Sequence, residues 1–246
     1  MHKTIPEATA FIERLADLLR HSPPPVRKIE IVLAPPFTAL AAVAAAIRAH
    51  PFVLSAQDLH WEAQGAFTGE VSASMLKDAG CRYVIIGHSE RRQLFGETNA
   101  AVQKKSAAAL RHGLRPILCI GETSDLRASG QTEQVLSVQL TEGLGAVGKE
   151  RAGEIIIAYE PVWAIGSGHP ATAEQAREAH RHIRTRIRDL WGQDTAGQVP
   201  ILYGGSVTPD NIAELLAAPE IDGALVGGAC LDPVQFARIL TIGRAV

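Results

Sequence analysis

A histidine directly after a predicted buried strand is the first candidate for chemistry. His88 stands in the segment Ile86-Gly87-His88-Ser89-Glu90, just past an apolar run. Imidazole is the usual proton-handling side chain because its pKa lies near neutrality. Gly87 lets the backbone approach closely, and Ser89 with Glu90 favours the first turn of a helix. The alternative is a histidine that caps this helix or is buried and hydrogen bonded.

A glutamate occupies the same kind of position later in the chain. Glu160 ends an apolar run and precedes Pro161, which favours an extended backbone at Glu160. A carboxylate among apolar neighbours is suited to act as a general base. A solvated glutamate at a strand end is the alternative. The segment 161–171 has rigid apolar ends and a glycine-rich centre, which is typical of a hinged lid.

Two glycine pairs follow the last two predicted strands. Gly204 and Gly205 come directly before Ser206, and Gly227 and Gly228 follow the next strand. Glycines leave backbone N–H groups uncovered, and a serine adds a hydroxyl, so these positions suit a phosphate group. Tight turns between strands and helices also use glycine and are the alternative explanation.

These candidates lie on a regular alternation of strands and helices. The predicted strands are residues 29–33, 52–56, 82–86, 116–120, 154–159, 199–203 and 221–226. The predicted helices include residues 11–20, 38–50, 100–112, 132–144, 173–191, 209–217 and 233–240. Continuous apolar strands are typical of a parallel sheet buried on both faces. The alternation therefore predicts an α/β fold with right-handed crossovers.

The first predicted element is a helix, whereas an α/β chain normally begins with a strand. Thr4, Pro6 and Glu7 are residue types that favour a helix start. An eight-stranded β/α barrel without its first β-strand explains this order, and a doubly wound open sheet is the alternative. Since nothing resembles a linker, we expect residues 1–246 to form a single barrel domain, close to the usual length of about 250 residues.

Composition and cysteine usage limit the classes of partner and the cellular location that the protein can have. A formal net charge of −2 argues against nucleic acid, which requires a concentrated basic surface. The sequence has neither an apolar run of about 18 residues nor a start like a signal peptide, so we expect no membrane association. Cys81, Cys119 and Cys230 show no CxxC spacing, which favours a reducing, cytoplasmic location.

Taken together, these segments resemble the triosephosphate isomerase family over essentially the whole chain. The matching stretches are residues 56–58, 64–72, 87–92, 158–166, 203–207 and 222–229, in the family's order. The resemblance implies the TIM (β/α)8 barrel and the interconversion of dihydroxyacetone phosphate and D-glyceraldehyde 3-phosphate. It also implies a place in glycolysis and gluconeogenesis, with no metal or organic cofactor.

The resemblance further implies a role for each matching position. Glu160 would move a proton through an enediolate, and His88 would polarise the carbonyl oxygen as a neutral imidazole, whose pKa in this family is known to be lowered by a helix N-terminus. Residues 161–171 would close as a lid that excludes water. The phosphate would be bound by Gly166, Ser206, Gly227 and Gly228.

A cytoplasmic homodimer is also implied by the resemblance. Thr68, on the loop of residues 60–68, would reach the partner's active site, and Glu90 would support the site. On a monomer the loop aromatics Trp61 and Phe67 would form an exposed apolar patch.

The sequence departs from the family at its start. Family members begin with a strand ending in Asn-Trp-Lys-Met, whose asparagine and lysine contact the substrate. The segment Met1-His2-Lys3-Thr4 matches the text after that lysine, so we expect the first strand and both residues to be absent. A catalytically impaired phosphate-binding barrel is one alternative. A sister isomerase for a four-carbon phosphoketose is another, although residues 226–229 and the lid argue against it.

Overall fold

Seven parallel strands form one sheet in the computed structural model, which describes residues 1–22, 29–166 and 170–242. Each strand pairs with the next one along the chain, so the strand order contains no reversal. This order excludes the doubly wound alternative, which requires a switch point. The strands are β1 (Ile31–Leu33), β2 (Phe52–Ala56), β3 (Tyr83–Ile86), β4 (Arg115–Ile120), β5 (Ile156–Tyr159), β6 (Ile201–Tyr203) and β7 (Gly223–Ala224).

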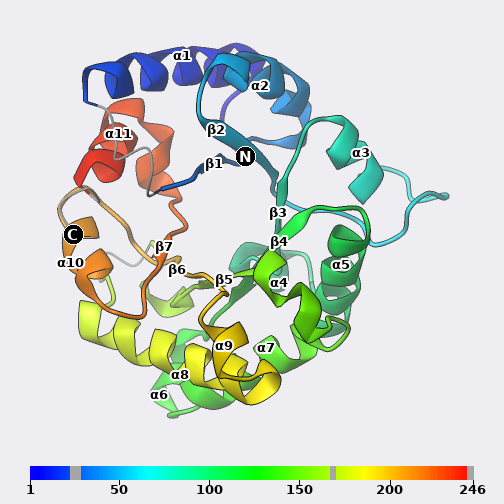
Figure 1. The fold of residues 1–246 in the computed structure, drawn as a ribbon, viewed down its shortest axis with the longest axis vertical. Coiled ribbons are helices and arrows are strands. Elements are labelled where there is room, and N and C mark those ends of the chain that lie inside the picture. The colour runs from blue at the N-terminus through cyan, green and yellow to red at the C-terminus, as the bar shows by residue number, and fades with distance from the viewer. Residues whose placement is uncertain (23–28, 167–169, 243–246) are drawn as a thin grey trace.

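Helices surround the strands, which converge at the centre of the view in Figure 1. The α-helices are α1 (Ile5–His21), α2 (Leu40–Ala46), α3 (Ala73–Asp78), α4 (Ser89–Leu94), α5 (Asn99–Arg111), α6 (Ser124–Ala128), α7 (Thr132–Leu144), α8 (Ala173–Trp191), α9 (Gln193–Ala196), α10 (Ile212–Ala217) and α11 (Pro233–Ile242). Short 3-10 helices are η1 (Phe37–Ala39), η2 (Ile47–Ala49), η3 (Lys149–Glu154), η4 (Val162–Ala164) and η5 (Gly228–Leu231). No helix in these described parts is both long and apolar enough to cross a membrane.

Alternating side chains of the strands divide the core into two layers. Val84 and Ile86 of β3 belong to the larger layer, which also contains the buried faces of the helices. Tyr83 and Ile85 belong to the smaller layer, whose residues come from the strands and the positions beside them. The smaller layer therefore fills the inside of the curved sheet, and the larger layer packs the sheet against the helices.

The first and last strands of the sheet, β1 and β7, differ from the helices outside them in whether they contact each other. Helices α1 and α11 pack against each other and complete the outer ring (Figure 1). Within the described residues, no hydrogen-bonded pairing joins β1 to β7. Among the described residues the sheet therefore has two unpaired edges, at β1 and at β7, although the helices α1 and α11 pack on each other.

The leading helix begins as predicted. The backbone N–H and hydroxyl of Thr4 both donate to the carboxylate of Glu7, at 2.7 and 2.8 Å, and α1 follows from Ile5. This arrangement occupies donors at the helix start that the helix itself leaves unpaired. The first element of the described chain is therefore a helix with a capped N-terminus.

Candidate active site

The ends of β3 and β5 bring the two predicted catalytic residues together. His88 caps α4 two residues after β3, and Glu160 directly follows β5. In the sheet only β4 separates these strands. The His88 Nε2 atom lies 2.9 Å from Glu160 Oε1. The imidazole and the carboxylate therefore form one site at the carboxyl ends of the strands, where barrels of this kind bind substrates.

The carboxylate of Glu160 is held against the first turn of α4. The Ser89 N–H donates to Glu160 Oε2 at 2.9 Å, and the Ser89 hydroxyl donates to Oε1 at 3.2 Å. Glu160 is only 2% exposed. Hydrogen bonds from Ser89 and His88 thus replace the water that this buried carboxylate has lost.

The protonation of His88 follows from its two ring nitrogens. The Glu90 N–H donates to Nδ1 at 3.3 Å, which requires a ring without a proton on that atom. Burial lowers the pKa of His88, but the hydrogen bond and the charge of Glu160 outweigh burial and raise it above its ordinary value, which is opposite in direction to the lowered pKa that the family resemblance implies. With Nδ1 occupied as an acceptor, the neutral ring carries its proton on Nε2 and donates it to Glu160. That proton can equally be donated to a substrate oxygen.

Buried charges fix helix α4 behind the site. Arg91 Nη2 lies 2.9 Å from Asp58 Oδ2, and Lys105 Nζ lies 2.6 Å from Asp58 Oδ1. Lys105 also pairs with Glu97, whose other oxygen lies 3.6 Å from Arg91 Nε. Arg92 donates to the carbonyl oxygen of Gly87 at 2.7 Å. Both arginines therefore serve to anchor the helix that presents His88 and Ser89.

Two glycines allow the neighbouring strand ends to approach Glu160. A Cβ atom at Gly121, just after β4, would overlap the carbonyl oxygen of Glu160. A Cβ atom at Gly204, just after β6, would lie 3.0 Å from Glu160 Cγ. The Gly204 N–H also donates to the backbone carbonyl oxygen of Tyr159 at 2.7 Å. Side chains at these positions would push the carboxylate out of place.

The first part of the predicted lid is anchored on a buried carboxylate. Glu122 is fully buried, and its Oε1 atom accepts hydrogen bonds from Trp163 Nε1 at 2.9 Å and from the Tyr159 hydroxyl at 3.1 Å. Arg127 pairs with the same oxygen at 3.3 Å and lies 4.2 Å from the centre of the Trp163 ring. Residues 167–169, in the middle of the predicted lid, lie outside the described part of the chain.

The glycines predicted to bind phosphate differ from those that pack beside Glu160. A Cβ atom at Gly166, Gly227 or Gly228 would meet nothing within 4 Å, so packing does not require glycine there. Ser206 follows β6 by three residues and Gly227 follows β7 by three, and β6 pairs with β7 in parallel. Their uncovered backbone therefore lies at the same end of the sheet as Glu160, as an anion site would require.

The loop after β2 agrees only in part with the sequence-based expectation. Phe67 is 43% exposed and Thr68 is also exposed, and the loop projects from the rim in Figure 1. Trp61, however, is half-buried, because it packs against the hydrophobic core. Its ring also stacks on His60, with 4.3 Å between the ring centres, and Lys104 lies over it. The prediction of two exposed aromatics was therefore wrong for Trp61. Glu90 is exposed beside His88, with its Oε2 atom 3.8 Å from Nδ1.

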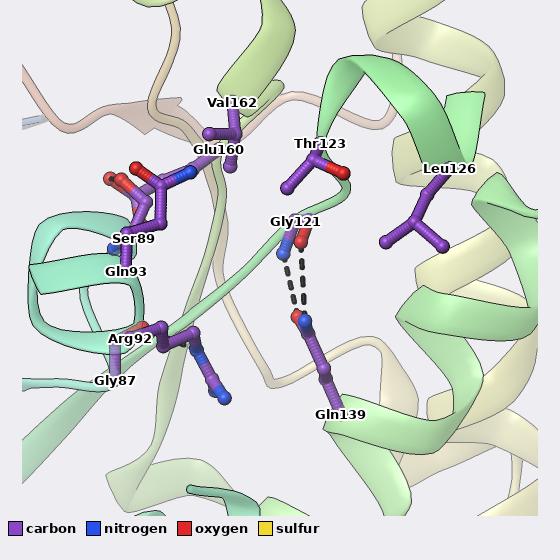
Figure 2. A pocket seen from close by; sticks show the side chains of 10 residues that line it. All are labelled: Gly87, Ser89, Arg92, Gln93, Gly121, Thr123, Leu126, Gln139, Glu160 and Val162. Atoms are coloured by element: carbon purple, nitrogen blue, oxygen red, sulfur yellow. Dashed lines mark hydrogen bonds between the residues drawn. The ribbon is translucent and has the colours of Figure 1, made fainter. Parts of the chain in front are cut away.

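A cavity of about 90 Å³ lies beside Glu160 (Figure 2). Gly121 and Gln139 line it together with Ser89 and Glu160. Sequence reasoning did not find Gly121, Glu122 or Gln139. The first two stand just past a buried strand, the same signal that identified His88 and Glu160. Gln139 lies within a long helix, where its residue type carries no such signal.

Known proteins resemble the chain along nearly its full length. The family model described as triosephosphate isomerase matches residues 1–243. Triosephosphate isomerase from Chloroflexus aurantiacus is 52% identical over 98% of this chain and 94% of its own length, and that from Moorella thermoacetica is 51% identical over the same shares. A crystal structure of triosephosphate isomerase from Bartonella henselae has a TM-score of 0.88 at 36% identity, over 99% of this chain and 95% of that one.

Proposed function

The chain belongs to the triosephosphate isomerase family and shares its barrel fold, and we propose that Glu160 is its catalytic base and His88 its electrophile. The enzyme interconverts dihydroxyacetone phosphate and D-glyceraldehyde 3-phosphate, a step of glycolysis and gluconeogenesis. The reaction moves one proton between adjacent carbons and one between their oxygens. The observation that carries this assignment is the 2.9 Å contact between His88 Nε2 and Glu160 Oε1 at the strand ends.

Each side chain has a defined task in this reaction. Glu160 removes a proton from the carbon beside the carbonyl group, and the bonding electrons move onto the carbonyl oxygen. The Nε2–H of His88 donates to that oxygen and stabilises the resulting enediolate, and through Nε2 the carbonyl oxygen gains a proton while the neighbouring hydroxyl loses one. Glu160 then returns the proton to the neighbouring carbon. The carboxylate must first leave the Ser89 hydroxyl, so the arrangement with Ser89 is the resting one.

The substrate phosphate is bound by uncovered backbone N–H groups. Gly227 and Gly228 support this assignment because open space surrounds them, and Ser206 adds its backbone and hydroxyl from the neighbouring strand end. Gly166, at the edge of the lid, contributes when residues 161–171 close. Closure excludes water, so the enediolate is protonated by Glu160 before it can lose phosphate.

In this proposal residues 1–246 form a single barrel domain, and the free edges that β1 and β7 have among the described residues can pair with an eighth parallel strand. The supporting observations are the two sheet edges that are unpaired in the described part of the chain and the contact of α1 with α11 outside them. By the family resemblance this strand carries an asparagine and a lysine that contact substrate. Adding a synthetic peptide with the family's first-strand sequence should raise activity and Tm, and unchanged values would contradict the proposal.

A homodimer is the proposed assembly, and the cytoplasm its location. Phe67, Met75, Leu94 and Phe95 are 43%, 59%, 73% and 69% exposed, an unusual amount of apolar surface. Thr68, beside Phe67, would reach the partner's site. The three cysteines are free, which suits a reducing compartment. Sedimentation should find a dimer, and a fully active monomer would refute it.

The decisive experiment replaces Glu160. Glu160→Gln keeps the shape but removes the base, so kcat should fall by about 10²–10⁴-fold, the usual contribution of a general base. Competitive inhibition by inorganic phosphate should stay unchanged, because the phosphate contacts come from other strand ends. Glu214→Gln, on the exposed surface of α10, is the matched control. Retained turnover in Glu160→Gln would refute the assignment.

Two further measurements separate the alternatives. His88→Gln should lose less activity than Glu160→Gln, because an amide can still donate to the carbonyl oxygen. Turnover of three-carbon phosphates should greatly exceed turnover of a four-carbon phosphoketose. Phosphate binding without any turnover would instead identify a catalytically impaired barrel.

A further inference from the structure

We propose that Gln139 is a positioning residue that holds the catalytic base in place through Gly121. Gln139 lies on α7, outside the set of residues expected to contact substrate. The inference rests on the proposed function, in which Glu160 is the base. It adds a supporting side chain for the backbone next to that base.

The side chain of Gln139 binds both polar groups of one glycine. The Gly121 N–H donates to Gln139 Oε1 at 2.8 Å, and Gln139 Nε2 donates to the Gly121 carbonyl oxygen at 3.2 Å. Figure 2 shows the two parallel hydrogen bonds between the helix and the strand end. Such a two-point contact fixes both the position and the orientation of the glycine.

Gly121 in turn lies directly against the backbone of Glu160. The Glu160 N–H donates to the carbonyl oxygen of Ile120 at 2.8 Å, and the Val162 N–H donates to that of Glu122 at 3.2 Å. Gly121 is the residue between these two acceptors. Because its Cα has no room for a Cβ against the Glu160 carbonyl group, a shift of Gly121 must shift Glu160 as well.

This part of the backbone needs a separate support. β4 ends at Ile120 and β5 ends at Tyr159, so Gly121 lies beyond the regular ladder of the sheet. Glycine also has more backbone freedom than any other residue. In the described chain, Gln139 is the hydrogen-bond partner of both the N–H and the carbonyl oxygen of Gly121.

The adjoining cavity explains why an apolar replacement would be harmful. The cavity of about 90 Å³ is lined by Gln139 and Gly121 on one side and by Ser89 and Glu160 on another (Figure 2). It is large enough to hold water. Without the amide of Gln139, Gly121 would turn toward that water to satisfy its hydrogen bonds, and Glu160 would lose its fixed position.

The test replaces Gln139 with a side chain of similar length that cannot form these bonds. In Gln139→Met, kcat should fall on the order of ten-fold, as expected for a small displacement of a catalytic group. KM and inhibition by inorganic phosphate should change less than two-fold, since no phosphate contact is altered. Gln134→Met, an exposed position on the same helix, is the matched control and should keep the wild-type kcat.

A structural role alone would give a different result. Leu140→Ala, at a buried position next to Gln139, should lower Tm but leave kcat per folded site unchanged. Phosphate titration counts the folded sites of each variant, so partial unfolding of Gln139→Met can be corrected for. A wild-type kcat per folded site in Gln139→Met would overturn the inference.

A double-mutant cycle shows whether Gln139 acts through the base. In the Glu160→Gln background, Gln139→Met should change the residual rate less than two-fold, because no base remains to be positioned. An equal loss in both backgrounds would also overturn the inference. If Glu160→Gln itself kept full turnover, the proposed function would fail instead, so the two failures can be told apart.

Discussion

Replacing Lys105 by methionine should destabilise the protein strongly, because this lysine lies between two buried carboxylates. Its ammonium group is 2.6 Å from Asp58 Oδ1 and also pairs with Glu97. The side chains of Lys105, Asp58 and Glu97 are only 6%, 8% and 3% exposed. Methionine preserves the length of the side chain but leaves the two carboxylates with Arg91 as their remaining cation.

The expected loss follows from the cost of an unpaired buried charge. Removing one partner of a buried ion pair typically costs about 3–5 kcal/mol of unfolding free energy. For 246 residues, an unfolding entropy of about 2.1 cal/mol/K per residue turns this loss into a decrease in Tm of roughly 6–10 °C. We therefore expect a large shift that a single thermal melt can detect.

The loss should also depend on pH. Burial raises the pKa of Asp58, and the hydrogen bond from Lys105 partly opposes this effect. Without Lys105 the pKa of Asp58 rises further, so the folded variant takes up a proton more readily than the unfolded chain. Its stability then increases as the pH falls through that raised pKa, and the deficit should be smaller near pH 5 than near about pH 8.

Thermal unfolding followed by circular dichroism at both pH values measures the effect. Lys104→Met is the matched control, because Lys104 is exposed and should change the unfolding free energy by no more than about 0.5 kcal/mol. A Tm within one degree of the wild type, or an identical deficit at both pH values, would refute the reasoning.

Three further predictions concern His180, Gly121 and Trp163. Burial lowers the pKa of His180 to about 4, so the unfolding free energy of the wild type should fall by about 3 kcal/mol as the pH drops from about 6.5 to 4. In urea titrations of His180→Gln, the unfolding free energy should lack this dependence on pH, and an unchanged dependence would contradict the prediction. Gly121→Ala should remove nearly all activity, since its Cβ would overlap the Glu160 carbonyl group, and wild-type kcat would show that the backbone can yield. Trp163→Phe loses the hydrogen bond to Glu122, and a hydrogen bond to a charged group contributes about 1.5 kcal/mol, so kcat/KM should fall roughly ten-fold. Steady-state kinetics equal to those of the wild type would contradict this role.

The fold was predictable because its strands are continuous apolar runs. β2 and the helices α7 and α8 have the predicted bounds. β7, predicted over residues 221–226, retains only Gly223–Ala224, and β1 retains Ile31–Leu33. Both lie at the ends of the sheet and, among the described residues, pair with one strand each, so fewer of their residues form a ladder. The short helices α4 and α6 were not predicted as separate elements, because their five or six residues are too few for a helical period.

The site was predictable only where the signal is local. His88 and Glu160 each follow an apolar strand, and that position identifies them. Their supports join distant parts of the chain: Ser89 contacts Glu160 across 71 residues, and Gln139 contacts Gly121 across 18. Which helix residue faces which strand end depends on how the helices pack on the sheet, and no short sequence pattern encodes that packing.

The unbroken strand order has a consequence for how the chain folds during synthesis. Every hydrogen-bonded strand pair joins segments that leave the ribosome one after another, from β1 with β2 to β6 with β7. Each new unit can dock on the preceding one without waiting for the end of the chain, and the entropy of loop closure at each step stays small. The packing of α11 on α1 is different, because it joins opposite ends of the chain. That contact can form only after α11 has been synthesised, so a ribosome stalled before α11 should carry an ordered sheet whose helix α1 packs on α2 but not yet on α11.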